Sequence, residues 1–311
     1  MRELHTIVKI VENKLFSHHS KFLLIGSCFS ENMAERLSYY KFQALSNPFG
    51  ILFNPYSIAN ALECILEDRV FECKDLFFYN GLWHSHLHHG SFSAPNKESV
   101  LEKINNAIRQ AHNFLNDADC LALTFGSSRV YERHGSIVAN CHKLPQQEFT
   151  ERRLSVSEIV DKYSALIEKI YAVNPKIQLI LSVSPIRYLV NGAAENSLNK
   201  ATLLLSIDEL QKRFTHIIYF PAYEILLDEL RDYRFFAEDM IHPSELTKKI
   251  VWERFSEAFF STDTLEFLPT IERLNKMLAH RNLHNNSEEQ EKFIKKRNLL
   301  QQKVDNYLIE N

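Results

Sequence analysis

Two potential nucleophiles follow a glycine near the start of the chain, in the stretch KFLLIGSCFSENMAERL at residues 21–37. Residues 22–25 favour a buried strand, and Ser30 is a suitable N-cap for a helix behind it. Cys28 would then lie beside the helix N-terminus, where peptide N–H groups can lower a thiol pKa below its usual value of about 8.5 and can hold an oxyanion. We therefore predict Cys28 as the nucleophile, with Ser27 either a cap or the true nucleophile.

An aspartate and a histidine stand three residues apart in the downstream stretch DMIHPS. Asp239 can accept a hydrogen bond from one imidazole nitrogen of His242 and fix its tautomer, which leaves the other nitrogen free to act as general base. Taken alone, Asp239 could equally cap a turn, and His242 could be structural. Together with a nucleophile at a strand end, however, the pair indicates acyl transfer.

Only seven glycines occur in 311 residues. This scarcity excludes a Gly-rich phosphate loop, so we predict no nucleotide cofactor and no other cofactor. Each remaining glycine is expected where the backbone needs a positive φ or comes close to another group. Gly26 and Gly126 each end an expected strand.

Further polar residues could bind a substrate. The stretch ANCHK supplies Asn140, His142 and Lys143, and the alternative is a loop whose polar groups satisfy one another. Arg231 and Arg234 could hold a carboxylate or phosphate through paired hydrogen bonds. Their alternative is ion pairing with the acidic residues of the same segment.

Three histidines alternate in WHSHLHHG, at His84, His86 and His88. On a strand they would share one face, and three imidazoles on one face could hold zinc. No second element supplies an obvious matching ligand, so we favour a solvated strand face and predict no metal site.

Composition excludes several classes of protein. With 36 Lys+Arg against 39 Asp+Glu and no basic stripe, nucleic acid is not an expected partner. No apolar segment is long enough to span a bilayer, and the first residues lack the features of a secretory signal. Five cysteines without a CxxC pair fit reduced thiols. We therefore expect a cytoplasmic protein without membrane association.

Strands and helices are expected to alternate along the chain. The expected strands are residues 22–25, 120–125, 177–183 and 217–220, and the expected helices are 31–40, 58–66, 97–115, 155–173 and 198–214. This alternation predicts a three-layer α/β/α domain around a parallel sheet, of the flavodoxin-like kind, with its site at the carboxyl ends of the strands.

The composition changes near residue 265, where the chain becomes highly charged and lacks glycine. We predict a first domain over residues 1–262 and a helical C-terminal extension over residues 263–311. Its residues Leu299, Leu300, Val304 and Leu308 would suit a helix–helix seam, and the extension could form a homodimer.

Several short motifs in a fixed order carry a family resemblance. They are GSCFS, NPFGILFNP, ANCHKLP, SPIR, YFPAYEI, RDYRFF and DMIHPS. Together they resemble the GSCFA-domain family, which is grouped with the SGNH (GDSL-like) hydrolases. The resemblance implies Cys28 in place of the nucleophilic serine, Asp239 and His242 as the DxxH pair, and Gly50 as an oxyanion glycine.

The third motif block of the SGNH hydrolases departs in this chain. Its place is taken by GSSR at residues 126–129, which lacks the usual asparagine, and Asn140 is a possible substitute. Arg187 of SPIR is a further candidate for substrate binding. The resemblance implies an acyl-ester hydrolase or acyltransferase acting on a small acyl ester or glycan. The alternative is a non-catalytic module that binds a small molecule or glycan.

Overall fold

A five-stranded parallel sheet forms the centre of the molecule. The computed structural model describes residues 6–280 and 287–310. The strands of this sheet are β1 (Lys21–Gly26), β2 (Gln43–Ser46), β5 (Cys120–Phe125), β9 (Gln178–Val183) and β10 (Ile218–Tyr219). Their spatial order is β10-β9-β5-β1-β2, which is the flavodoxin-like order with a switch point between β1 and β5. The sequence predicted four of these strands and missed β2.

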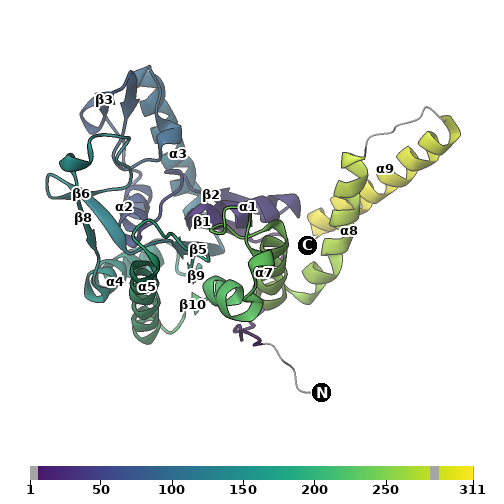
Figure 1. Cartoon of the computed structure of the whole chain (residues 1–311). Helices are drawn as coiled ribbons and strands as arrows, with labels where there is room; N and C mark the ends of the chain where they lie inside the picture. The colour runs from purple at the N-terminus through teal and green to yellow at the C-terminus, as the bar shows by residue number, and fades with distance from the viewer. Residues whose placement is uncertain (1–5, 281–286, 311) are drawn as a thin grey trace.

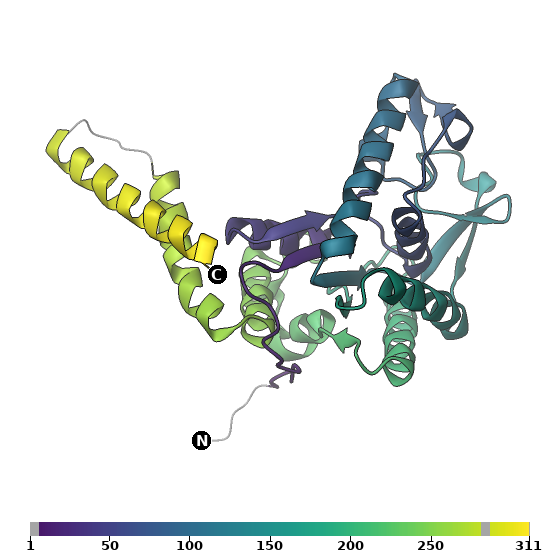
Figure 2. The same cartoon turned by 180° about the vertical axis from the view of Figure 1, so that it is seen from behind.

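Side chains of β1 alternate between the two faces of the sheet, as the pleat requires. The helices around the sheet are α1 (Cys28–Tyr39), α2 (Pro55–Leu66), α3 (Lys97–Asp117), α4 (Val156–Val173), α5 (Ala193–Arg213), α6 (Ala222–Glu224) and α7 (Glu245–Phe259). Leu23 and Ile25 enter the larger core, which α2, α3, α4 and α5 cover, while Phe22 and Leu24 enter a second core beneath α1 and α7. Figures 1 and 2 show these layers from front and back. The predicted three-layer α/β/α class is confirmed.

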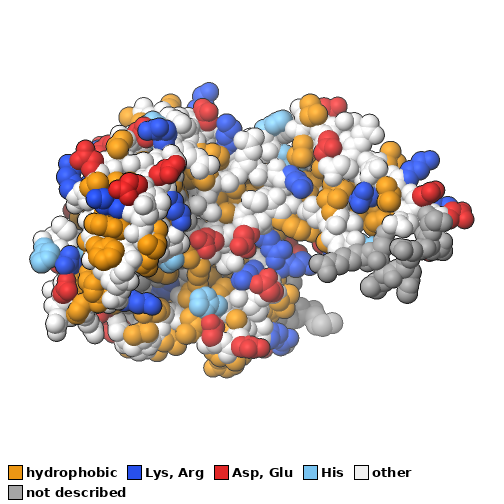
Figure 3. Space-filling view, turned by 90° about the horizontal axis from the view of Figure 1, so that it is seen from above, with side chains coloured by type: hydrophobic (Ala, Val, Ile, Leu, Met, Phe, Trp, Pro, Cys, Tyr) orange, Lys and Arg blue, Asp and Glu red, His pale blue; other side chains and the backbone are white. Residues whose placement is uncertain are grey.

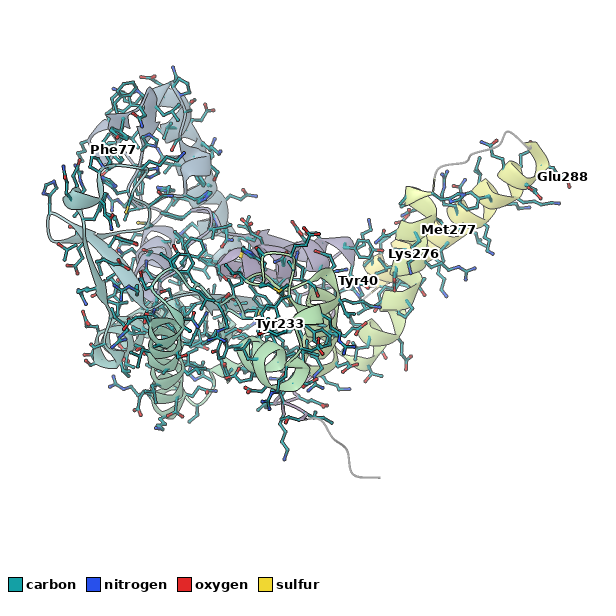
Figure 4. The ribbon with its side chains drawn as sticks, viewed as in Figure 1. Tyr40, Phe77, Tyr233, Lys276, Met277 and Glu288 are labelled. Atoms are coloured by element: carbon teal, nitrogen blue, oxygen red, sulfur yellow. The ribbon has the colours of Figure 1, made fainter. Side chains whose placement is uncertain are left out.

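Five short strands build an accessory lobe that the sequence analysis did not predict. They are β3 (Phe77–Tyr79), β4 (Leu82–His84), β6 (Arg129–Arg133), β7 (Ser136–Val138) and β8 (Thr150–Arg153). The β3–β4 hairpin follows α2, and the three-stranded sheet β7-β6-β8 follows β5. The carbonyl of His86 accepts the N–H groups of Ala139 and Asn140, which joins the two parts. Figure 4 places Phe77 in this lobe, away from the central sheet.

The charged C-terminal segment forms two helices, α8 (Thr262–Ala279) and α9 (Ser287–Glu310), which project from the domain in Figure 1. Val304 of α9 packs between Ile271 and Leu274 of α8, with the predicted seam residues Leu300 and Leu308 beside them. Leu299 is 70% exposed and lies outside this seam. The predicted helix–helix seam therefore forms within one chain, without Leu299.

Tyr40 connects the C-terminal helices to the domain. Its ring stacks on Trp252 at 5.3 Å, and it also packs against the core between α8 and α9. Figure 4 shows Tyr40 at the end of α1, next to these helices.

Acidic and basic side chains are interspersed over the face shown in Figure 3. None of the helices in the described parts of the chain combines the length and apolar character needed to cross a membrane.

Candidate active site

The turn between β1 and α1 lies at the switch point of the sheet. Gly26 has φ +149°, and a Cβ there would stand 2.3 Å from the carbonyl oxygen of Thr124, its neighbour in β5. The next N–H, of Ser27, donates to the same oxygen at 3.3 Å. Only glycine therefore lets β1 end this close to β5 before the chain turns into α1.

Ser27 is the cap of α1 and is almost fully buried. Its Oγ accepts the N–H of Phe29 at 3.3 Å, and its carbonyl accepts the N–H of Ser30 at 2.8 Å. The capping role expected for Ser27 is thus observed. Ser30, which the sequence analysis took as the cap, is instead a buried residue within the helix.

Cys28 is the first residue of α1 and is half-buried. Burial, with the negative charge of Glu31 adding to it, raises the pKa of the Cys28 thiol above its ordinary value. The N–H groups of Cys28 and Phe29 and the ammonium group of Lys248 oppose this rise and do not outweigh it. The expectation of a lowered thiol pKa is therefore wrong, because burial outweighs the helix N-terminus.

Asp239 and His242 form a tight hydrogen-bonded pair. Asp239 Oδ2 lies 2.6 Å from His242 Nδ1, and Asp239 Oδ1 accepts the N–H groups of Ile241 and His242 at 2.9 Å. The hydrogen bonds from His242 and Ile241 lower the pKa of Asp239 to about 2. Because an ionised carboxylate only accepts, Nδ1 must carry the proton, and Nε2 of the neutral ring is left as a proton acceptor.

A small hairpin presents this pair at its tip. Phe236 forms an antiparallel β-bridge with Pro243, and the N–H of Ala237 donates to the carbonyl of His242 at 2.7 Å. Met240 adopts a φ of +57° in the turn between them. His242 and Asp239 are both about half exposed. Figure 4 labels Tyr233, which lies on the same exposed loop ahead of the hairpin.

The hairpin leads directly into α7, which lies against α1. Arg36 of α1 pairs with Glu245 at 3.8 Å, and Lys248, one turn further along α7, acts electrostatically on Cys28. A groove of about 210 Å³ runs between the two helices and is lined by Asn32, Glu35, Arg36, Tyr39, Glu245 and Lys248. Its α1 residues continue the helix face on which Cys28 lies. Within residues 6–280 and 287–310, no hydrogen bond joins Cys28 to His242.

Gly50 and Gly126 both have their peptide N–H groups engaged. Gly50 donates to Asn47 O at 2.7 Å, and Gly126 donates to Phe53 O at 2.7 Å. A Cβ on Gly50 would also stand 2.3 Å from His89 Cβ, so this glycine serves close packing of the β2–α2 loop on the accessory lobe. In this structure neither glycine offers a free oxyanion donor.

Asn47 is a polar residue at the switch point that the sequence analysis missed. Its Oδ1 accepts the N–H of Gly26 at 2.9 Å, while its buried Nδ2 has no hydrogen-bond partner among the described residues. The positive φ of Asn47, +45°, could have been expected, because asparagine, the first residue of NPFG, adopts positive φ more readily than most residues.

Asn140, His142 and Lys143 lie in the accessory lobe. Asn140 Oδ1 accepts the N–H of His142 at 2.8 Å, and His142 Nε2 contacts Ser85 O at 2.7 Å. Burial lowers the pKa of His142 to about 4. Asn140 and His142 thus form hydrogen bonds within the accessory lobe, and in the described chain no hydrogen bond connects them to Cys28.

The histidines of WHSHLHHG do not share a strand face, because β4 ends at His84. His84 Nδ1 lies 2.7 Å from Ser93 Oγ, His86 stacks on Phe77, and His88 stacks on Phe49. The solvated strand face is therefore wrong: these rings lie in an aromatic cluster. The described residues hold no group of three or more His, Cys, Asp or Glu arranged to bind a metal.

The two candidate arginines differ in their surroundings. Arg231 is exposed at the end of the π-helix Ile225–Leu230, with φ +44°, whereas Arg234 pairs with Asp232 at 3.0 Å, as its alternative reading predicted. Arg187 follows β9, and its buried Nε has no partner among the described residues.

Lys200 is the residue of this region that the sequence analysis missed most clearly. Its side chain is 2% exposed, and its Nζ donates to Gly126 O at 2.7 Å and to Ser184 O at 2.8 Å. These two carbonyls follow the carboxyl ends of β5 and β9. The signal in the sequence was a cluster of polar residues, including Asn196 and Asn199, on the buried face of α5.

The fold and these residues define a doubly wound α/β protein with a cysteine at the helix N-terminus that follows its first strand and an Asp–His pair before its last covering helix. A model of the GSCFA family matches residues 21–255, and the chain belongs to that family. A search of curated proteins gave no match.

Two solved structures are similar to this chain over most of its length. One is a carbohydrate esterase family 3 protein from Talaromyces cellulolyticus, with 8% identity over 82% of this chain and 99% of that chain and a TM-score of 0.39. The other is a Clostridium thermocellum family 3 carbohydrate esterase, with 12% identity over 81% and 98% of the two chains and a TM-score of 0.35. At these values the activity has to be argued from this chain's own residues.

Proposed function

We propose that this protein transfers or hydrolyses acyl groups carried on a hydroxyl compound, such as a carbohydrate ester. The observation that carries the proposal is the Asp239–His242 pair, whose geometry leaves Nε2 as a proton acceptor. The pair immediately precedes α7, and the positive charge of Lys248 in the first turn of α7 favours ionisation of the Cys28 thiol. A nucleophile, a base and the group that orients the base are the parts that acyl transfer requires.

In the proposed reaction His242 takes the proton of the Cys28 thiol. The thiolate attacks the acyl carbon, and a carbon–sulfur bond forms. The peptide N–H group of Cys28, at the first position of α1, holds the oxyanion, because the next N–H group, of Phe29, already donates to Ser27 Oγ. The carbon–oxygen bond then breaks, and His242 returns its proton to the leaving alcohol. Water or an acceptor hydroxyl resolves the thioester and restores the thiol.

In the described chain no hydrogen bond joins His242 to Cys28. The exposed hairpin that carries His242 must therefore shift toward Cys28, or a water molecule or the substrate oxygen must bridge the two side chains. The same movement would exclude water from the thiol.

The test is hydrolysis of p-nitrophenyl acetate and of an acetylated sugar. We expect His242→Ala to lower turnover by about 10²- to 10⁴-fold. His19→Ala, which removes an exposed histidine outside the site, is the matched control and should retain full activity. Equal turnover in wild type and His242→Ala would refute the proposal.

A non-catalytic binding module is the second candidate, and the raised pKa of the Cys28 thiol favours it. In that case the groove between α1 and α7 would hold a ligand without turnover. Ligand-dependent protection of Cys28 from alkylation, without hydrolysis of any ester in the panel, would select this alternative.

A further inference from the structure

Phe53 is an exposed aromatic residue within an otherwise buried segment. It is 51% exposed, whereas its neighbours Leu52 and Asn54 are both buried. Asn54 caps α2 and Pro55 begins that helix, so the backbone that follows Phe53 is fixed. The segment therefore presents one phenyl ring to solvent in a defined position.

Hydrogen bonds hold this segment across the switch point of the sheet. The N–H of Leu52 donates to Gly26 O at the end of β1, at 2.9 Å, and Phe53 O accepts the N–H of Gly126 after β5, at 2.7 Å. Doubly wound sheets bind their ligands in the crevice outside these strand ends. Since Cys28 follows Gly26 by two residues, Phe53 is fixed beside the turn that carries the thiol.

Gly126 provides the space for this contact. A Cβ on Gly126 would stand 3.1 Å from Phe53 O and 3.5 Å from both Cα and Cβ of Phe53. The atoms of Phe53 that lie closest to Gly126 thus belong to the backbone and Cβ, which alanine also has. The phenyl ring can therefore be removed without removing the atoms that hold the segment in place.

The surfaces on the two sides of Cys28 differ in chemistry. The groove between α1 and α7 is lined by polar and charged side chains, and its Glu245 pairs with both Arg36 and Lys248. Phe53 instead leads into α2, which covers the opposite face of the sheet. A phenyl ring has neither a donor nor an acceptor group, so it suits an apolar part of a ligand, whereas the groove suits hydroxyl groups.

Other exposed apolar side chains lie on loops that leave the same edge of the sheet. Tyr188, Leu189 and Val190 follow β9, the neighbour of β5, and Met240 lies in the turn of the hairpin that carries His242. An apolar group that extends beyond Phe53 would find further apolar surface on these loops.

We infer that Phe53 is a specificity-determining residue, against whose ring the acyl group lies, and that the site takes esters of apolar acyl groups longer than acetyl. This assignment rests on the proposed function in taking Cys28 as the nucleophile. The hydroxyl compound then occupies the groove between α1 and α7, and the acyl chain extends from the thiol toward the α2 face. Because the segment is already fixed, the contact costs little conformational entropy.

The first experiment compares kcat/KM for p-nitrophenyl acetate and p-nitrophenyl hexanoate. We expect the hexanoate to be preferred by about tenfold, because its four additional methylene groups contact apolar surface on one side. Phe53→Ala should bring this ratio close to one. Phe78→Ala is the matched control, since Phe78 is a similarly exposed phenylalanine (57%) on β3 of the accessory lobe, and it should keep the wild-type ratio.

Two results of this experiment would overturn the inference. One is a ratio of hexanoate to acetate that is the same in wild type and Phe53→Ala. The other is a Phe53→Ala variant that instead loses discrimination between ethyl acetate and hexyl acetate, because the ring would then contact the alcohol part of the ester. In both cases the turnover itself would leave the proposed function in place.

A second experiment does not depend on ester turnover. N-ethylmaleimide and N-hexylmaleimide alkylate thiols, and peptide mass spectrometry gives the labelling rate of Cys28 relative to the exposed Cys73 of the same chain. We expect the hexyl reagent to label Cys28 about fivefold faster than the ethyl reagent, and Phe53→Ala to remove this preference. That result in a protein that hydrolyses no ester would retain the apolar contact and reject the proposed function. An equal preference in wild type and Phe53→Ala would overturn the inference.

Discussion

Replacing Gly26 with alanine tests the geometry on which the whole site depends. At φ +149° a non-glycine residue costs about 1–3 kcal/mol in backbone strain. The new Cβ would also stand 2.3 Å from Thr124 O, a backbone atom that cannot rotate away. Separating β1 from β5 to relieve this contact should cost about 1–3 kcal/mol more. Alanine also restricts the unfolded chain more than glycine does, which offsets about 0.4–1 kcal/mol of the loss in the free energy of unfolding.

We therefore expect Gly26→Ala to lower the free energy of unfolding by about 2–5 kcal/mol. The matched control is Gly135→Ala in the turn between β6 and β7. Gly135 also has a positive φ, +78°, but a Cβ there would meet nothing within 4 Å. The free energy of unfolding of Gly135→Ala should fall only by the amount that backbone strain costs.

The measurement is urea denaturation followed by circular dichroism, with the dependence on urea concentration compared among the three proteins. Gly26→Ala should be less stable than Gly135→Ala by about 1–3 kcal/mol. If the two variants lose the same free energy, the close approach of β1 to β5 is not the reason for glycine at position 26. The alkylation rate of Cys28 in Gly26→Ala would then also be unchanged.

Burial of Lys200 lowers its pKa to about 7, so between about pH 7 and pH 10.5 the unfolded chain holds more protons than the folded chain. Wild-type stability should rise with pH in that window, and less so in Lys200→Met, as urea titrations at pH 7 and pH 9 would show. Burial lowers the pKa of His88 to about 3 and that of His142 to about 4, so the unfolded chain binds more protons than the folded chain below pH 6.5. The free energy of unfolding should therefore fall as the pH drops from 6.5 toward 4, by up to about 1.4 kcal/mol per pH unit for each ring. His142→Gln should reduce this loss, as thermal melts at pH 7 and pH 5 would show. Asp239→Asn removes the carboxylate that holds His242 and should lower ester turnover by about 10²- to 10⁴-fold with unchanged circular dichroism; full turnover would contradict its orienting role. We expect Leu299, 70% exposed on α9, to form a homodimer contact, so Leu299→Lys should change the mass in light scattering from dimer to monomer; a monomeric wild type would contradict this expectation.

The central sheet could be predicted from the sequence because its strands are continuous apolar runs. The expected strand 120–125 coincides with β5, and the helices expected over 97–115 and 155–173 form as α3 and α4, which Asn96 and Ser155 cap. Strand β2, QALS, was not predicted because it is a short, partly exposed edge strand. The accessory lobe was not predicted because strands such as RVYER and TERR are short and rich in charged residues, and so lack a long apolar run.

The site could be predicted in part. The Asp239–His242 pair is local in sequence, and its three-residue spacing was sufficient to expect the hydrogen bond. The thiol pKa was not predictable from the helix N-terminus alone, because burial of Cys28 is a property of the folded chain. Lys200 could not be found by spacing either, since its partners are backbone carbonyls of two distant segments, and a lysine within a helix is usually exposed.

The two cores have a consequence for biosynthesis. A chain made from its amino end completes β1 first, and one face of that strand, with Phe22 and Leu24, is covered by α7, which is made near the end of the domain. Phe16 pairs with Phe260, so even the segment before β1 waits for the last part of the domain. A nascent chain therefore exposes an aromatic sheet face, and keeps Cys28 apart from His242, until synthesis has passed α7. The enzyme we propose would thus remain inactive throughout translation of its domain, and its growing chain would present a binding surface for chaperones.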